Sequence, residues 1–269
     1  MKTKIFGILL ALVLVVGFSL VMALPAGAIG TDYYVRTDGS DSNDGTADDA
    51  AHAWLTIQHA IDNVTAGGTI NVAAGTYIEN IALVDGVSVY GSGDDVTTIL
   101  GTGIGSVVIA NGVGDTTVLS GFTIRNGSTG DSGGGMHNTD SSPTVSHCTF
   151  SANLAAFGGG MANDNSSPTV TGCTFSGNSA DYGGGMHNSN GSSPVISTCT
   201  FENNTVTESG GGMFSNTSSP TVTDCTFSEN HADWYGGGME NINWSSPTVT
   251  TCTFSGNSAD EAIIPVTLT

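Results

Sequence analysis

The sequence predicts an all-β fold, a parallel β-helix in which each coil consists of two or three short strands and stacks on the coil before it. Five copies of one segment recur every 25 to 27 residues in the second half of the 269-residue chain, and so steady a period indicates a solenoid. Each copy also holds β-branched and aromatic residues bounded by Gly, Asn, Ser and Pro, which indicates strands and turns.

Residues 1–28 have the pattern of a secretory signal peptide. Lys2 and Lys4 precede a long apolar stretch, and Ala26-Gly27-Ala28 is a small-residue cleavage site. An uncleaved membrane anchor is the alternative, because the apolar stretch is long enough to span a bilayer. In both cases we expect an exported protein, secreted or held at the cell surface or in the cell envelope, with membrane contact only through this segment if it is uncleaved.

Residues 29–68 predict an N-terminal strand, a loop and a short capping helix. The helix is indicated by apolar residues at amphipathic spacing, namely Leu55, Ile57, Ala60, Ile61 and Val64. Such a cap protects the open end of a solenoid, where an uncovered sheet edge would invite aggregation. Residues 69–130 then form irregular coils, in which Leu119, Phe122 and Ile124 already have the register of the copies that follow.

Residues 131–262 form five regular coils, and residues 263–269 form a C-terminal tail. From Pro to Asn each copy spans ten residues, so all variation in length falls in the turns. Three columns recur through the copies: Cys148, Cys173, Cys199, Cys225 and Cys252; Met136, Met161, Met186, Met213 and Met239; Asn153, Asn178, Asn204, Asn230 and Asn257. We expect the cysteines and methionines to fill the interior, and the asparagines to form a hydrogen-bonded ladder.

The fixed segment, apolar-x-x-Cys-x-Phe-x-x-Asn, also has the spacing of a leucine-rich repeat. A leucine-rich repeat would return through a helix or a 3₁₀ segment. Here the return path holds three successive glycines, as in Gly210 to Gly212, followed by Pro220. Glycine and proline both oppose a helix, so a β-helix is favoured.

The repeat resembles that of the polymorphic outer membrane proteins, whose marks are a Gly-Gly-Ala-Ile-like step and Phe-x-x-Asn. In this sequence they stand as Gly-Gly-Gly-Met and as Phe-x-x-Asn, for example Phe175 to Asn178. Members of that family are surface-exposed β-helical passenger domains, often adhesins, carried by a C-terminal barrel in the cell outer membrane. The chain ends at Thr269 without a barrel segment, so we do not expect it to be an autotransporter by itself.

The first half resembles the pectin-lyase-like superfamily. The resemblance rests on Tyr33 to Val35, Gly39 to Thr46, Leu55 to Ile61 and Ala73 to Tyr77. It implies a right-handed β-helix whose open end is covered by a short helix. The superfamily is rich in polysaccharide lyases and glycoside hydrolases, so it also implies an alternative function as an enzyme.

The acidic composition excludes one class of partner. Removal of residues 1–28 leaves two basic and 24 acidic residues, a net charge of −22, and nucleic acid binding is therefore not expected. We expect no cofactor other than calcium, for which Asp38, Asp41, Asn43 and Asp44 are oxygen-rich candidates beside a glycine. The exposed column of Asp181, Asp233 and Asp260 is a second candidate, and solvation of the surface is the alternative explanation of the charge.

The five cysteines of an exported chain suggest disulfides, but in-register parallel stacking points their side chains the same way. That arrangement fits the disulfide torsion poorly, so we predict a buried ladder of free thiols. Metal ligation is disfavoured, because no Cys-x-x-Cys spacing occurs. His137 and His187 share a repeat position but lie two coils apart, about 10 Å, which is too far for a shared metal.

The candidates for catalysis are few. The superfamily's lyases generally abstract a proton with Arg or Lys beside calcium, and Arg125 is the candidate base, with an outward-facing strand residue as the alternative. Asn138-Thr139-Asp140 matches the first motif of polygalacturonases, but later copies place similar letters there, so we assign it to a turn of the repeat.

Aromatic residues near the glycine steps are the candidates for binding: Phe157, Tyr182, Trp234, Tyr235 and Trp244. They could contact sugars or a protein, and packing against the corner glycines is the alternative. We therefore expect a non-catalytic adhesion or binding module for a polysaccharide or a cell-surface protein. A polysaccharide lyase or glycoside hydrolase, and a structural spacer or fragment, are the alternatives.

Overall fold

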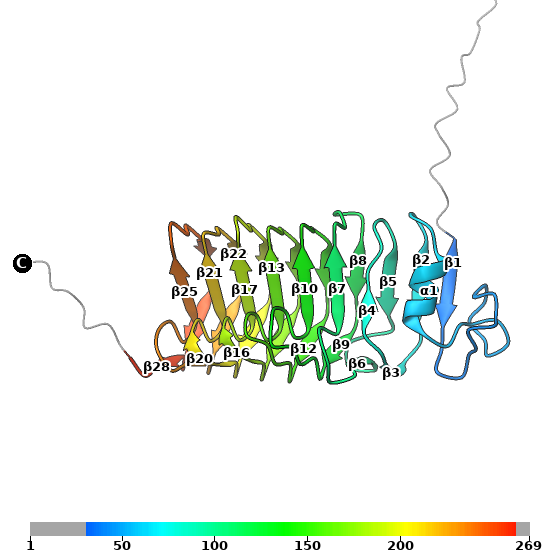
Figure 1. Cartoon of the computed structure of the whole chain (residues 1–269), viewed down its shortest axis with the longest axis horizontal. Coiled ribbons are helices and arrows are strands. Elements are labelled where there is room, and N and C mark those ends of the chain that lie inside the picture. Colours follow the sequence, from blue (N-terminus) through cyan, green and yellow to red (C-terminus); the bar gives the residue numbers. More distant parts are fainter. Residues whose placement is uncertain (1–30, 262–269) are drawn as a thin grey trace, which may run out of the picture.

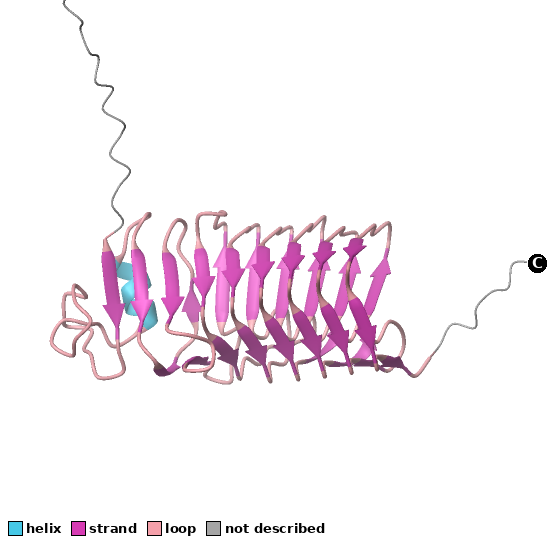
Figure 2. Ribbon diagram, turned by 180° about the vertical axis from the view of Figure 1, so that it is seen from behind, coloured by secondary structure: helices cyan, strands magenta, loops and turns pink. Residues whose placement is uncertain are grey.

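A computed structural model of the chain describes residues 31–261 and shows one elongated solenoid (Figure 1). The expected signal peptide and C-terminal tail lie outside the described residues. The described part contains one α-helix, and its strands are parallel and form four sheets that run along the solenoid (Figure 2). The predicted all-β parallel β-helix with a short N-terminal helix is confirmed.

Sheets A and B form two sides of each coil, in that order along the chain. Sheet A contains β1 (Asp32–Val35), β2 (Thr69–Val72), β5 (Ser88–Gly91), β8 (Val118–Ser120), β11 (Thr144–Ser146), β14 (Thr169–Thr171), β18 (Val195–Ser197), β22 (Thr221–Thr223) and β26 (Thr248–Thr250). Sheet B contains β3 (Gly75–Ile78), β6 (Thr97–Leu100), β9 (Thr123–Arg125), β12 (Thr149–Ser151), β15 (Thr174–Ser176), β19 (Thr200–Glu202), β23 (Thr226–Ser228) and β27 (Thr253–Ser255).

Sheet C closes the coil, and the smaller sheet D precedes it in the later coils. Sheet C contains β4 (Ile81–Ala82), β7 (Val108–Asn111), β10 (Met136–Thr139), β13 (Met161–Asp164), β17 (Met186–Ser189), β21 (Met213–Asn216) and β25 (Met239–Ile242). Sheet D contains β16 (Ser179–Tyr182), β20 (Thr205–Ser209), β24 (His231–Ala232) and β28 (Ser258–Ala259). Equivalent residues of the repeat pair directly, as Phe175 does with Phe201.

The helix α1 (Ile57–Asn63) packs on the first strands of sheets A and C. Thr56 caps its N-terminus, and the Glu79 carboxylate accepts hydrogen bonds from the backbone N–H groups of Ile57 and Gln58 at 2.9 Å each. Burial raises the pKa of Glu79. Leu55 was expected on the buried face of this helix, and that was wrong: it precedes the cap and is 40% exposed. No helix in residues 31–261 is both long enough and apolar enough to cross a membrane.

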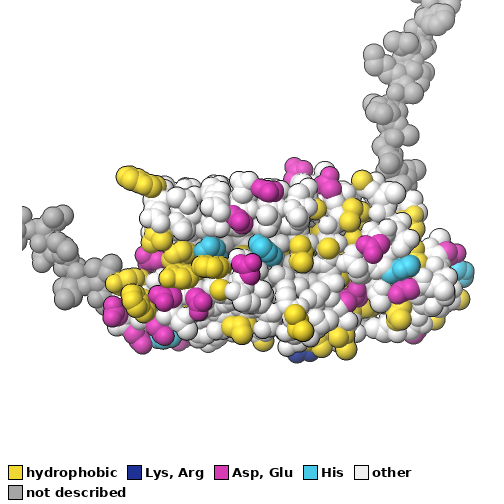
Figure 3. Space-filling view, in the orientation of Figure 1, with side chains coloured by type: hydrophobic (Ala, Val, Ile, Leu, Met, Phe, Trp, Pro, Cys, Tyr) yellow, Lys and Arg dark blue, Asp and Glu magenta, His cyan; other side chains and the backbone are white. Residues whose placement is uncertain are grey.

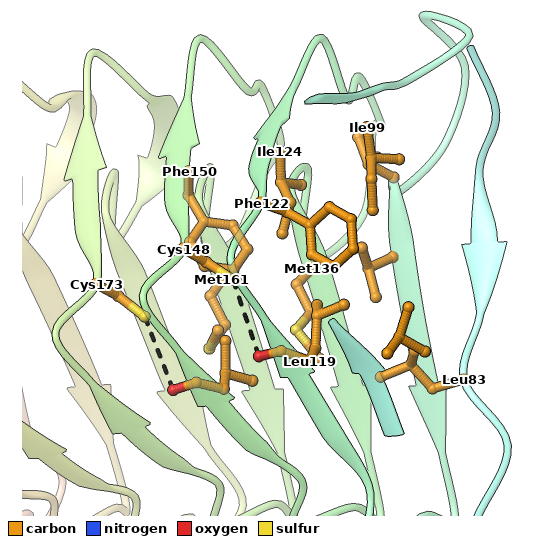
Figure 4. Close-up of a cluster of buried hydrophobic side chains, with 14 of the residues drawn as sticks. Leu83, Ile99, Leu119, Phe122, Ile124, Met136, Cys148, Phe150, Met161 and Cys173 are labelled. Atoms are coloured by element: carbon orange, nitrogen blue, oxygen red, sulfur yellow. Dashed lines mark hydrogen bonds between the residues drawn. The ribbon is translucent and has the colours of Figure 1, made fainter. Parts of the chain in front are cut away.

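The interior of the regular coils contains columns in which one residue type recurs from coil to coil. At the start of these coils Cys173 follows Cys148, and Met161 follows Met136 (Figure 4). Five phenylalanines follow one another with ring centroids 4.6–4.9 Å apart and planes within 5° of parallel, namely Phe150, Phe175, Phe201, Phe227 and Phe254. Four of these rings are fully buried, as are the first four methionines of the glycine steps. Offset aromatic stacking adds to the stability gained by burying the rings.

The asparagine column after the Phe strand forms a continuous ladder, here called the first Asn ladder. Asn178 shows the pattern: its Oδ1 accepts from the Asn153 N–H and side-chain amide, each at 3.1 Å. Its own amide donates to Asn204 Oδ1 at 3.0 Å and to the Phe150 carbonyl at 3.0 Å. All four hydrogen-bonding positions of the buried side chain are therefore used, which removes the cost of burying it.

A second Asn ladder lies inside sheet C. The Asn138 amide donates to Asn163, which donates to Asn188, both at 2.8 Å, and Asn188 reaches the Ser215 hydroxyl at 3.4 Å. The assignment of Asn138 and its equivalents to a turn was wrong, because these side chains point inward from strands and are fully buried. Asn138 Oδ1 is buried without a hydrogen-bond partner, and its neighbour in the preceding coil is Ala110.

The cysteines line the interior next to sheet A and carry free thiols. Cys173 and Cys199 each donate a backbone N–H to the sulfur of the next coil at 3.4 Å, and their thiols face carbonyl oxygens, as with Cys173 and Val145 at 3.7 Å (Figure 4). The hydrogen bond with Cys173, supported by burial, raises the pKa of Cys199 to about 12. The Cys199 thiol therefore stays protonated at neutral pH, which suppresses its reactivity.

The triple-glycine steps form the tight corner between sheets D and C. Gly183 has a φ of 65°, a backbone conformation that favours glycine. At Gly185, an added Cβ would lie 2.5 Å from the Gly212 carbonyl oxygen and 2.8 Å from the Phe201 ring. The step thus brings the backbones of adjacent coils close together, and larger residues would force them apart.

Candidate functional site

An aromatic groove lies on the outer face of sheet C in the regular coils. It has a volume of about 200 Å³ and is lined by Phe157, Tyr182, His187, Phe214, Asn216 and Ile242. Hydrophobic side chains gather beside histidines on this face of the regular coils, with acidic side chains around them (Figure 3). We call this feature the aromatic groove throughout.

Two columns of the repeat build the groove. The first stands just before the glycine steps: Ser132, Phe157, Tyr182, Ser209 and Tyr235. The second stands five residues later on sheet C: His137, Ala162, His187, Phe214 and Glu240. The sizes at the two positions differ from coil to coil: Ala162 accompanies Phe157 and Ser209 accompanies Phe214, whereas Tyr182 accompanies His187. The two columns therefore share one surface layer of rings.

The rings of the groove contact one another across three coils. Phe157 stacks on Tyr182 with centroids 5.8 Å apart, and His187 stacks on Phe214 at 5.4 Å with planes 8° apart. Phe157 also contacts His187 at 5.2 Å, and Tyr182 contacts Phe214 at 5.0 Å. Because each ring packs against two others, the groove is held in place before any ligand arrives, which lowers the entropy cost of binding.

Burial determines the charge of the groove. It lowers the pKa of His187 to about 4, so the imidazole is neutral at neutral pH. It is also the main cause of the raised pKa of Tyr182, to which the nearby Glu208 carboxylate contributes. Glu240, paired in register with Phe214, has its pKa raised by burial. The groove is thus neutral along its floor and acidic at its edge.

The structure separates the aromatic candidates into two groups. Phe157 and Tyr182 line the groove, and Tyr235 continues their column with Trp234 packed edge-on at 6.4 Å. Trp244 lies apart, beyond the opposite end of β25, where its side chain is 96% exposed. The structure therefore does not bring Trp244 to the groove.

Arg125, the candidate base, lies on another side of the coil. It ends β9 in sheet B, is exposed, and pairs in register with Leu100 and Ser151. Within residues 31–261 it forms no ion pair. Arg125 therefore does not lie in the aromatic groove.

The four calcium candidates of the N-terminal loop have partners within the protein. Asp38 pairs with Arg36 at 2.8 Å, and Asp41 accepts from the N–H groups of Leu55 and Thr56 at 2.9 Å each. Asn43 donates to the carbonyls of Ala50 and Ala53, and Asp44 accepts from Thr46. The three carboxylates do not form a cluster of ligand atoms within 4.8 Å, and calcium binding there stays a prediction.

The three carboxylates of the second acidic column also have partners within the protein. Asp181 accepts from the Thr207 hydroxyl at 2.8 Å, whereas Asp233 and Asp260 meet at His231, whose Nε2 lies 3.3 Å and 3.9 Å from their carboxylate oxygens. The Nδ1 atom of His231 contacts the Ser258 hydroxyl at 3.0 Å. The histidine was not among the predicted ligands, because its equivalents in the other coils are not histidines.

Sequence comparison gives one family match. Residues 85–259 match the family model described as "Right handed beta helix region", which covers well over half of the chain. No curated protein sequence matches the chain.

Three solved structures are similar in fold. A pectin methylesterase from carrot shares 13% identity and a TM-score of 0.53, with 86% of this chain and 85% of that chain covered. Pectate lyase Pel9A shares 16% identity and a TM-score of 0.56, with 79% and 55% covered. The pectin methylesterase of Aspergillus niger shares 16% identity and a TM-score of 0.50, with 89% and 90% covered. At such low identity the likeness shows a common β-helix fold.

Proposed function

Because the chain belongs to the right-handed β-helix family, we propose that it is an exported binding module, without catalytic activity, that holds a polysaccharide in the aromatic groove. The single observation that carries this proposal is the run of rings Phe157, Tyr182 and Phe214, in which Tyr182 packs on both phenylalanines along three neighbouring coils. Phe157 is exposed, Tyr182 is half-buried and Phe214 is buried. Exposed aromatic rings on a rigid scaffold supply large contact area at little entropy cost, as binding surfaces require.

The contents of the groove favour binding over catalysis. His187 is its one titratable lining residue apart from Tyr182, and its ring is packed against Phe157 and Phe214. With a pKa of about 4 it carries no proton to donate at neutral pH. Arg125 lies on sheet B, away from the rings. The residues that line the groove therefore include no cation for polysaccharide cleavage, and His187 is not protonated to serve as its acid.

Two further observations point to a polysaccharide. The solved structures of similar fold are named as pectin methylesterases and a pectate lyase, which makes polysaccharides the first ligands to test. The rings also recur at the strand spacing of about 4.8 Å along the solenoid, so an extended polymer can meet a ring in each coil. Export and a location at the cell surface complete the proposal and rest on the pattern of residues 1–28.

The proposal is tested by mixing the purified chain with a panel of neutral and acidic polysaccharides, with and without calcium. Retention in affinity electrophoresis and release of unsaturated or reducing ends are both recorded. We expect retention without cleavage, loss of retention in Tyr182→Ala, and unchanged retention in Trp244→Ala, which removes a more exposed ring outside the groove. Product release that disappears in Arg125→Ala would instead make the chain a polysaccharide lyase.

A further inference from the structure

We infer that the aromatic groove selects a neutral glycan and rejects one that carries uronic acid carboxylates. This inference rests on the proposed function and names the class of its ligand. It depends on the charged side chains around the groove and not on the rings that line it.

Cations are absent from the groove within the part of the chain that the structure describes. Residues 31–261 contain two strong bases, Arg36 and Arg125. Arg36 is occupied by Asp38 at 2.8 Å and by Asp48 at 3.0 Å in the N-terminal loop. Arg125 stands on sheet B. A ligand carboxylate in the groove would therefore find no guanidinium or ammonium group to pair with.

Carboxylates instead surround the groove. Asp164 stands on sheet C in the same row as Asn216 and Ile242, which line the groove, and its charge acts on His187. Glu208 lies close to the Tyr182 hydroxyl, and Glu240 neighbours Phe214. A uronate placed on the rings would have these like charges nearby, and this repulsion opposes its binding.

The same groups suit a neutral sugar. Carboxylate oxygens accept hydrogen bonds from hydroxyl groups, and each has lone pairs to spare. The negative faces of the rings attract the polarised C–H groups on one side of a sugar ring. A neutral sugar chain lying along the solenoid axis therefore meets rings beneath it and acceptors beside it, and it brings no charge that needs a partner.

The experiment compares each polymer with its own charged form. Glucan, galactan and mannan hexasaccharides are each used as neutral chains and after oxidation of their C6 hydroxymethyl groups to carboxylates. Binding to the full chain is measured by calorimetry at 20 mM and 500 mM NaCl. For each polymer that binds, we expect the neutral form to bind at least tenfold more tightly than its oxidised form at low salt. High salt should narrow the difference, because it screens the repulsion.

A double variant, Asp164→Asn with Glu208→Gln, tests the local charges while it keeps the side-chain sizes. It should bind the oxidised form several-fold more tightly than the wild type does, and should reduce the ratio of the affinities for the neutral and oxidised forms by at least that factor, because the amides remove the repulsion and their oxygens still accept hydrogen bonds. Equal or tighter binding of the oxidised form by the wild type would overturn the inference and leave the proposed function intact. Failure to bind any of the polymers in either form would overturn the proposed function, and the inference with it.

Discussion

The irregular coils before residue 130 and the five regular coils after it share sheets A, B and C but are stabilised differently. In the irregular coils the interior is aliphatic, with Ile70, Val89 and Leu119 stacked in sheet A. In the regular coils the Cys, Met, Phe and first Asn columns each repeat one residue, and buried asparagines bond from coil to coil. An apolar interior is therefore sufficient for the coil, and the repeated polar side chains add a fixed register.

The register follows from the two kinds of contact. Aliphatic side chains gain free energy from burial in any arrangement that excludes water, because the hydrophobic effect is not directional. A buried asparagine that loses its partner costs free energy at once. A slip of one residue in the regular coils would break several such bonds, whereas the irregular coils would lose packing alone.

The largest effect is expected from removing a member of the first Asn ladder. Asn178→Ala leaves the Asn153 N–H, the Asn153 amide and the Phe150 carbonyl without their partner, and should lower the free energy of unfolding by about 3–5 kcal/mol. Asn80→Ala in the irregular coils removes bonds that water can replace and should cost about 1 kcal/mol. Urea unfolding compares them, and equal costs would refute the distinction between the regions.

A smaller effect is expected from interrupting the phenylalanine stack. Phe201→Leu removes ring contacts at 4.7 Å and 4.6 Å on its two sides and should cost about 2 kcal/mol. Ile99→Val is the matched change in the irregular coils, where a buried aliphatic side chain loses one methylene, and should cost about 1 kcal/mol. Thermal unfolding measures both, and a larger loss for Ile99→Val would show that the stack adds nothing.

The pH dependence of stability should reveal the buried histidine of the groove. The pKa of His187 is lowered to about 4 in the folded chain, so the unfolded chain binds more protons between pH 4 and 6.5. Its contribution to stability is complete above pH 6.5 and is lost as the pH falls through this window. From pH 7 to 5 the wild type should lose about 1–2 kcal/mol more than His187→Phe. Parallel urea titrations at the two pH values check this, and identical losses would contradict it.

The smallest effect is a gain at the boundary between the regions. Ala110→Ser places a hydroxyl group beside Asn138 Oδ1, the buried oxygen without a partner, and should raise the free energy of unfolding by about 1 kcal/mol. Ser215 already ends the same ladder in this way at its other end. Ala110→Val fills similar space without a donor and should bring no gain. If both variants behave alike in urea unfolding, the unpaired oxygen is not a weakness of the fold.

Much of this fold could be predicted from the sequence, because the period of the repeat is visible in its letters. The constant distance from Pro143 to Asn153 and its equivalents predicts a common coil, and stacking in register follows from it. The second Asn ladder could not be recognised in the same way. Its column has Ser215 in the fourth coil, and neighbouring letters such as Asp140 are typical of turns.

The aromatic groove could be predicted only in part. Phe157 and Tyr182 stand out in the sequence, but the column is interrupted at Ser209. The missing bulk is supplied by Phe214, five residues later in the same coil and in a different column. Only the fold shows that both positions face the same surface, and that His187 packs between two rings. A search for a large residue and a small residue five positions apart would have found Phe157 with Ala162 and Ser209 with Phe214.

The near-constant coil of 25 to 27 residues has a consequence for how such a chain can change in evolution. Each regular coil pairs its strands with those of the coils on either side of it, and its ends meet equivalent positions of its neighbours. Deletion of residues 161–185 would join Gly160 to Met186 and restore every column. In-frame duplication or loss of about 25 codons thus changes the length of the rod by one strand spacing, about 4.8 Å, and moves the surface rings as a set. Genetic recombination can therefore adjust the reach of the protein in equal steps without redesigning its interior.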